Sequence, residues 1–305
     1  MTEHGTQAVT GAYGYTGRCL AHKLLAKGVR VRTLTNSIPA GDPFDGAVER
    51  HPLAFADRDQ LIRSLVGVQV LYNTYWVRFN HRRFSHAAAV ENSKRLFDAA
   101  AEAGVLRIVH VSITNPAEDS PFEYFRGKAE LERYLKGLGI SYAILRPAVF
   151  FGREDILINN IAWVLRNVPV FGVFGDGNYG IQPIHVEDFA DLAMAASLRT
   201  DNPTIDAIGP ESFTFRELVA ALGKIIGAPR PILSIPPQVG LLAGKLMGAF
   251  THDVVITREE IGGLMAGLLA VDADPVGKIR LTEWATRHRD TLGQRYASEL
   301  GRRRT

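Results

Sequence analysis

Two side chains suited to proton transfer, Tyr124 and Lys128, stand four residues apart in the segment EYFRGK. Residues at this spacing project from one face of an α-helix, so the phenol and the ammonium group are expected to share one volume. A neighbouring positive charge stabilises a phenolate and lowers the pKa of a tyrosine. The pair therefore predicts proton transfer by Tyr124, with Lys128 supplying the charge. The same spacing is also common in simple packing pairs on amphipathic helices.

A serine is expected beside this pair. The apolar run Arg107–Ser112 predicts a strand that ends at Ser112, and Ser120, Pro121 and Glu123 form the pattern of a capped helix start. In a parallel sheet the carboxyl ends of the strands line the ligand crevice. We therefore predict a catalytic group in which the hydroxyl of Ser112 orients a substrate oxygen while Tyr124 and Lys128 handle the proton.

A glycine loop lies near the N-terminus. Gly11, Gly14 and Gly17 follow the apolar strand Gln7–Thr10 and open the helical segment Gly17–Lys27. Glycines in this setting let the backbone approach a pyrophosphate, and the helix N-terminus supplies N–H donors and the positive end of a dipole. The loop predicts a dinucleotide site, and the contacts expected there are its three glycines together with Tyr13 and Tyr15.

The end of the second strand indicates which dinucleotide binds. An acidic residue there would accept a hydrogen bond from the ribose 2′-hydroxyl of NAD, but the chain has Thr35 and Asn36. Arg18, directly after the last glycine, is able to reach a 2′-phosphate, although a solvated side chain is the alternative. We therefore expect NADP(H) rather than NAD(H), with Arg18 and Asn36 among the cofactor contacts and Lys128 also able to hold the ribose.

The elements that must position these residues alternate between strands and helices. Further strands are expected at Val29–Thr35, Val68–Asn73 and Ser141–Leu145, and helices at His86–Ala103 and after Ser120. This rhythm predicts an α/β fold with a Rossmann doubly wound, mainly parallel sheet.

Glycine and proline become frequent after Pro147, where a second lobe is expected. We predict a dinucleotide-binding domain at 1–150, with 184–209 returning to it. A smaller, mostly helical substrate lobe is expected to comprise 151–183 and 210–305.

Composition excludes several classes of protein. The chain has 305 residues, of which 46% are hydrophobic, and a single cysteine, Cys19, so neither a disulfide framework nor a metal cluster is expected. The net charge is only +3, and the basic run Arg302–Arg304 is typical of a solvated end rather than a nucleic-acid arm. No leader is evident in Met1–Gln7 and no segment suffices to span a membrane. A cytoplasmic protein is expected, with no nucleic-acid partner.

The residues also resemble a known family, the extended and atypical branches of the short-chain dehydrogenase/reductase superfamily, which includes the NAD-dependent epimerases and dehydratases. The resemblance covers most of the chain and lies in these motifs: TGAYGYTGR, Asp57 after the third strand, AAEAGVLRIVHVS, Tyr124 and Lys128, LRPAVFFG, and QPIHVEDFADLA. It implies that Asp57 contacts the adenine, that Thr74 lies beside the cofactor, and that the backbone from Pro147 to Val149 faces the nicotinamide. For Asp57, capping the helix that follows is an equal alternative.

These observations predict an NAD(P)(H)-dependent oxidoreductase that acts on a carbonyl or secondary alcohol of a small, fairly apolar substrate. Two alternatives stay open. The segment FFGRED is similar to the nucleotide-binding accessory subunit of respiratory complex I, which implies a sensor or assembly subunit that holds NADP(H) without turnover. The second alternative is that the protein is an enzyme with epimerase or dehydratase chemistry. A homodimer is compatible with the sequence.

Overall fold

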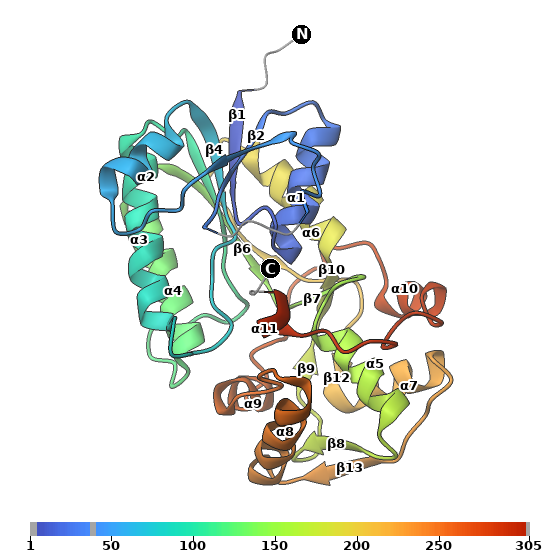
Figure 1. The fold of residues 1–305 in the computed structure, drawn as a ribbon. Coiled ribbons are helices and arrows are strands. Elements are labelled where there is room, and N and C mark those ends of the chain that lie inside the picture. The colour runs from blue at the N-terminus through green and yellow to red at the C-terminus, as the bar shows by residue number, and fades with distance from the viewer. Residues whose placement is uncertain (1–4, 37–40, 303–305) are drawn as a thin grey trace. The chain divides into compact units, whose positions relative to one another are not determined.

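The computed structural model describes residues 5–36 and 41–302 of the chain, which divides into two compact units (Figure 1). Unit 1 comprises Met1–Arg146 and Phe189–Ile205, and unit 2 comprises Pro147–Asp188 and Asp206–Arg304. The chain therefore passes from unit 1 into unit 2 at Pro147. It returns to unit 1 at Phe189 for most of one helix and part of a strand, and it enters unit 2 again at Asp206.

Unit 1 is built on a seven-stranded sheet in the order β11-β6-β5-β4-β1-β2-β3. Its strands are β1 (Thr6–Thr10), β2 (Val31–Leu34), β3 (Val48–His51), β4 (Val68–Asn73), β5 (Arg107–Val111), β6 (Ser141–Pro147) and β11 (Thr204–Ala207). The pairings from β6 through β3 are all parallel. The chain reverses its direction of winding between β1 and β4, and such a switch point is where open α/β sheets bind ligands, at the carboxyl ends of the strands.

Helices cover both faces of this sheet, as expected for a doubly wound fold (Figure 1). They are α1 (Tyr15–Ala26), α2 (Arg58–Leu65), α3 (His86–Glu102), α4 (Glu123–Gly137) and α6 (Val186–Ser197). Helices α1 and α6 share one face, where Lys23 Nζ lies 2.8 Å from Asp191 Oδ1, and α2, α3 and α4 share the other. Because both faces are covered, central strand residues such as Leu71, Ile108 and Ile144 are completely buried.

The expected Rossmann fold is confirmed, with two differences in detail. Strand β11 was not among those predicted, and β3 was implied only by the family resemblance, as the strand before Asp57. Strand β3 contributes only one buried side chain, so it lacks the apolar run of an inner strand. The predicted cap at Ser120 is wrong. Helix α4 begins at Glu123 after Phe122, and Ser120 Oγ instead accepts a local hydrogen bond from the N–H of Phe122 at 3.3 Å.

Unit 2 joins helices to three short strand pairs. Its strands are β7 (Val149–Phe151), β8 (Phe171–Phe174), β9 (Gly180–Ile181), β10 (Pro183–His185), β12 (Phe213–Thr214) and β13 (Ile232–Ile235). Its helices are α5 (Leu157–Asn167), α7 (Phe215–Ile225), α8 (Pro237–Thr251), α9 (Arg258–Met265), α10 (Leu281–Arg287) and α11 (Glu299–Arg302). Strands β7 and β10 pair in parallel, as do β8 and β13, whereas β9 and β12 are antiparallel.

A separate apolar core holds unit 2 together. Ile158 of α5, Val219 of α7 and Trp284 of α10 are buried in it, beside Phe151 of β7. Within the described ranges, no helix is long and apolar enough to cross a bilayer, and no group of histidine, cysteine and acidic side chains is arranged to hold a metal ion.

Candidate functional site

The glycine loop connects β1 to α1 at the switch point of the sheet. Gly11 has a φ of +65°, a conformation that strains residues with a side chain, and its carbonyl accepts a hydrogen bond from the N–H of Gly14 at 2.8 Å. Gly14 is the N-cap of α1 and provides no capping side chain. The helix end therefore presents backbone, not a side chain, to whatever binds above the loop.

Gly17 lets this loop pack tightly. A Cβ at Gly17 would lie 2.4 Å from the carbonyl oxygen of Gly11, which no side chain tolerates, whereas a Cβ at Gly14 would lie 3.2 Å from the same atom. The hydroxyl of Thr33 on β2 holds the other side of the turn: it donates to the carbonyl of Val9 and accepts from the N–H of Ala12, both at 3.0 Å. The turn is thus fixed from two sides.

The two expected tyrosines flank this turn. The rings of Tyr13 and Phe44 lie 5.7 Å apart, and burial, followed by the charge of Asp42, raises the pKa of Tyr13. Tyr15 is the first residue of α1 and is half-buried.

A buried polar network, not foreseen from the sequence, ties β1, β4 and β5 together where they end. The hydroxyl of Thr10 accepts from the N–H groups of Thr74 (2.8 Å) and Tyr75 (3.0 Å) and donates to Asn73 Oδ1 (3.2 Å). Asn73 Nδ2 donates in turn to Nδ1 of His110 at 3.1 Å. Complete burial, together with the charge of Lys128, holds the pKa of His110 well below its usual value. Because the imidazole of His110 stays neutral, the network holds the ends of the three strands together and does not supply protons.

The residues expected at the second strand have defined positions. The carboxamide of Asn36 is turned to the backbone, donating to the carbonyl of Leu53 at 2.8 Å and accepting from its N–H at 3.1 Å. Arg18 lies in the first turn of α1, and its N–H donates to Gly14. A further cation, Arg50, is paired in register with Thr33 and therefore points to the face of the sheet that carries the glycine loop. Its charge acts on Tyr13 in that loop.

Tyr124 is half-buried among aromatic rings in the first turn of α4. The ring of Tyr124 packs edge-on with the rings of Trp76 and His86, with 5.5 Å and 5.6 Å between the ring centres. The rings of Trp76 and His86 are themselves stacked, with 5.9 Å between their centres. Gly127 makes room for the indole, since a Cβ there would lie 3.2 Å from Trp76. Trp76 is therefore a ring against which Tyr124 packs.

Lys128 is almost completely buried beneath the same indole. Its Nζ donates to the carbonyl of Val111 at 2.7 Å and lies 4.2 Å from the centre of the Trp76 ring. Burial lowers the pKa of Lys128 to about 7, while the negative charge of Glu132 acts in the opposite direction. The face of the indole also favours the charged form. Tyr124 and Lys128 therefore share one aromatic neighbour, as their spacing indicated.

Ser112 makes an unexpected contact. Its hydroxyl is buried and donates to Glu132 Oε1 at 2.6 Å, and Glu132 is held by two hydrogen bonds from the guanidinium of Arg146. The proton that would orient a substrate oxygen is therefore given to Glu132 in this arrangement. Thr114, two residues further on, is a second completely buried hydroxyl.

The remaining predicted positions belong to different elements. Asp57 caps α2, its carboxylate accepting from the N–H of Gln60 at 2.9 Å, so the capping role is confirmed and the contact with adenine stays a prediction. Thr74 directly follows β4 and donates to the carbonyl of Thr10 at 2.6 Å. Pro147 ends β6 and Val149 begins β7, and both are assigned to unit 2.

The sequence contains a signal for the polar network around Thr10, Asn73 and His110, although the network was not predicted. Asn73 and His110 are polar residues within otherwise apolar strands, VQVLYN and RIVHV, and a buried polar group requires a partner. The pair of Glu132 and Arg146 had no such signal, because charged residues on helices and strand ends are usually solvated.

Comparison with known proteins agrees with the fold. The chain is 27% identical over 251 residues to the mitochondrial NADH-ubiquinone oxidoreductase 40 kDa subunit of Neurospora crassa, covering 77% of this chain and 64% of that subunit. The match therefore covers less than two thirds of the length of that subunit. It is 30% identical over 263 residues to sterol demethylase protein B of Methylococcus capsulatus, covering 77% of this chain and 78% of that protein.

Among solved structures, the triphenylmethane reductase of Citrobacter sp. complexed with NADP(H) superposes with a TM-score of 0.75 at 16% identity, over 93% of this chain and 99% of that one. At this identity the likeness concerns the fold. The family model for the NAD dependent epimerase/dehydratase family matches residues 8–209, which span the sheet, the glycine loop and α4. The chain therefore belongs to the NAD dependent epimerase/dehydratase family.

Proposed function

We propose that this protein is an NADP(H)-dependent oxidoreductase that interconverts a carbonyl and a secondary alcohol on a small, fairly apolar substrate. The observation that carries the proposal is the glycine loop. An uncapped helix end at Gly14 lies over a turn that only glycine at position 17 permits, at the switch point of a parallel sheet. This geometry suits a pyrophosphate.

The choice of NADP(H) is supported by charge at the end of β2. No carboxylate stands at Thr35 or Asn36 to meet a ribose 2′-hydroxyl. Arg50 points to the loop face from the neighbouring strand, and no acidic side chain of residues 5–36 or 41–302 forms an ion pair with it. Arg18 lies in the first turn of α1, so the chain places two cations, Arg18 and Arg50, on the elements that flank the loop, and a guanidinium suits a 2′-phosphate.

Tyr124 and Lys128 supply the proton chemistry of the proposal. The bound nicotinamide would supply or accept the hydride. The hydroxyl of Tyr124 gives its proton to the substrate oxygen as the carbonyl is reduced, and takes it back in the reverse reaction. The ammonium of Lys128, fixed by the carbonyl of Val111, stabilises the phenolate that remains. Ser112 remains our candidate for orienting the substrate oxygen, which requires its hydroxyl to turn away from Glu132.

The apolar substrate class is proposed from unit 2. Val239, Leu242 and Leu246 expose half or more of their surface along α8, and Met265 is exposed at the end of α9. A polar substrate such as a sugar would gain little from these side chains.

The test combines binding with turnover. We expect calorimetry to show NADPH binding at least ten times more tightly than NADH, and a panel of apolar ketones and aldehydes to include one that oxidises NADPH. Tyr124→Phe should retain NADPH binding and lose at least a hundredfold in kcat. Tyr134→Phe, on the same helix but bonded to Asp98, is the matched control and should keep its activity. Equal turnover by both variants would contradict the role of Tyr124.

A second candidate function is a protein that holds NADP(H) without turning it over. It is favoured by the hydroxyl of Ser112, whose proton is given to Glu132, and by the similarity to the Neurospora subunit. In that case NADPH binds with the same preference, no substrate of the panel is reduced, and the protein co-purifies with a stoichiometric partner. Epimerase or dehydratase chemistry differs again, since it regenerates the cofactor within each turnover and consumes no NADPH.

A further inference from the structure

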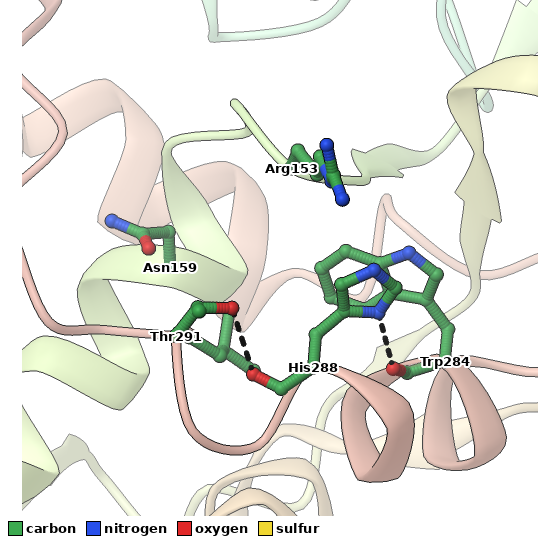
Figure 2. A pocket seen from close by; sticks show the side chains of 6 residues that line it. Arg153, Asn159, Trp284, His288 and Thr291 are labelled. Carbon is green, nitrogen blue, oxygen red and sulfur yellow. Dashed lines mark hydrogen bonds between the residues drawn. The ribbon is translucent and has the colours of Figure 1, made fainter.

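Unit 2 contains a pocket that plays no part in the proposal above. Six side chains line a cavity of about 390 Å³: Arg153, Asn159, Trp284, His288, Thr291 and Leu292. Figure 2 shows the guanidinium of Arg153 on one side of the hollow, the rings of Trp284 and His288 below it, and Asn159 and Thr291 opposite the rings. Cavities of roughly 300–1,000 Å³ are typical of small-molecule sites.

The charge of this pocket is positive. Arg153 lies between β7 and α5, is exposed, and forms no ion pair with an acidic side chain of the described ranges. The nearby carboxylate of Asp155 is turned to the start of α5, where Oδ1 accepts from the N–H of Ile158 at 2.6 Å. No acidic residue lines the cavity. A planar cation with five N–H donors is therefore available to a ligand oxyanion.

An aromatic wall faces this cation. The rings of Trp284 and His288 are stacked at 4.6 Å with 25° between their planes, and the ring of Phe151 packs edge-on with that of Trp284, with 5.6 Å between the ring centres. His288 Nδ1 donates to the carbonyl of Trp284 at 2.8 Å, which fixes the imidazole ring (Figure 2). A flat apolar ligand has a flat surface to lie against.

The opposite wall is rigid. The carboxamide of Asn159 donates to the carbonyl of Arg295 at 2.8 Å and accepts from the N–H of Gly293 at 3.1 Å, so it is fully used in holding the segment after α10. Gly293 has a φ of +73°, and a Cβ there would lie 2.5 Å from the backbone of Ala162 on α5. Because the segment packs so closely, the cavity is formed before any ligand arrives.

We infer that this pocket binds a small aromatic carboxylate, with the carboxylate on Arg153 and the ring against His288 and Trp284. A single guanidinium matches the two oxygens and single charge of a carboxylate, whereas a phosphate dianion needs more donors than the lining offers. The volume is ample, since a cavity of about 150 Å³ already holds benzene. The assignment does not depend on the glycine loop, because every lining residue belongs to unit 2.

The test uses 2-naphthoate as the probe and the full-length protein. Calorimetry should show saturable binding, with 2-naphthamide, which has the same rings and no charge, bound at least tenfold more weakly. Arg153→Gln should weaken 2-naphthoate binding at least tenfold and leave the thermal midpoint unchanged. The matched control is Arg287→Gln, which removes the same charge from α10 outside the pocket and should bind as the natural protein does.

Three results would overturn the inference: no binding of 2-naphthoate by the natural protein, equal binding of the uncharged amide, or unchanged binding by Arg153→Gln. Inorganic phosphate that displaces 2-naphthoate at equal concentration would also contradict the carboxylate assignment. NADPH binding is measured on the same preparations, so a failure here is distinguishable from a failure of the cofactor proposal.

Discussion

Lys128 shows how one residue reconciles burial with charge. It is 2% exposed, yet it lies on the face of Trp76 and donates to the carbonyl of Val111. Burial disfavours its charged form, whereas the indole and Glu132 favour it. A group balanced in this way near neutral pH is suited to tuning a neighbouring phenol, and its state is open to measurement.

We predict that the stability of unit 1 rises with pH above about 7 through Lys128, whose pKa is lowered to about 7 in the folded protein. Between this value and the ordinary lysine pKa the unfolded chain holds a proton that the folded chain has lost, so raising the pH favours folding. At about 1.4 kcal/mol per pH unit, the effect reaches about 3 kcal/mol between pH 7 and 9.5. Urea unfolding of Lys128→Met and the natural protein checks this.

Lys128→Met lacks the titrating group, so its stability relative to the natural protein should be highest at pH 7 and should decline by about that amount at pH 9.5. Lys136→Met, on the half-exposed side of the same helix, should follow the natural protein at both pH values. A difference between Lys128→Met and the natural protein that does not change with pH would show that the lysine keeps its charge throughout.

At the scale of elements, the contact between the start of α1 and the end of β1 decides whether a dinucleotide can bind. Gly17→Ala should lower NADPH affinity at least tenfold, because its methyl group would lie 2.4 Å from the carbonyl of Gly11 and push the helix away from the loop. Gly14→Ala, at 3.2 Å, should have a smaller effect. Titration calorimetry measures both.

Gly137→Ala is the folding control for these glycine variants. Position 137 is helical and its Cβ would meet nothing within 4 Å, so the variant should bind NADPH normally and unfold at a slightly higher temperature. If Gly17→Ala bound NADPH as tightly as Gly137→Ala, the loop could not be the site of the pyrophosphate.

A second contact between elements joins α4, β5 and β6. Glu132 accepts from Ser112 and from the guanidinium of Arg146, and 3% of its surface is exposed. Glu132→Leu should cost about 3 kcal/mol, because it leaves Arg146 and the hydroxyl of Ser112 without their acceptor. The double variant Glu132→Leu/Arg146→Leu should recover much of this loss. Chemical denaturation would contradict this expectation if the double variant were the less stable of the two.

At the scale of the whole molecule, the sequence predicted unit 1 far better than unit 2. Apolar runs identified β1, β4, β5 and β6, and the glycine loop lies where it was expected, because strand and turn signals are local. The contacts of Ser112 and Lys128 were not predictable, since they depend on Glu132 and Trp76, which come from other elements. Spacing along a helix indicates a shared face but not what covers it.

The pocket of unit 2 could not be found from the sequence at all. Arg153 and His288 are separated by most of unit 2. Arg153 lies in FFGRED, a segment noted only for its resemblance to a known subunit, and no pattern connects it to His288. The stack of Trp284 and His288 arises from one helical turn, but only the folded segment after α10 brings it to Arg153. Sites built from distant segments leave no periodic signal, whereas sites built on one loop do.

Hydrogen exchange tests both sites in one experiment on the intact chain. Because each unit has its own apolar core, we expect NADPH to slow exchange of the backbone amides in residues 11–18 and 74–76, and 2-naphthoate to slow those in 153–159 and 284–292. A ligand stabilises the segments that it contacts, by about 2.7 kcal/mol at a hundred times its Kd. Arg153→Gln should reduce the second set of changes and keep the first, and Gly17→Ala should do the reverse. If either variant reduced both sets equally, the two sites could not be the independent features that their residues describe.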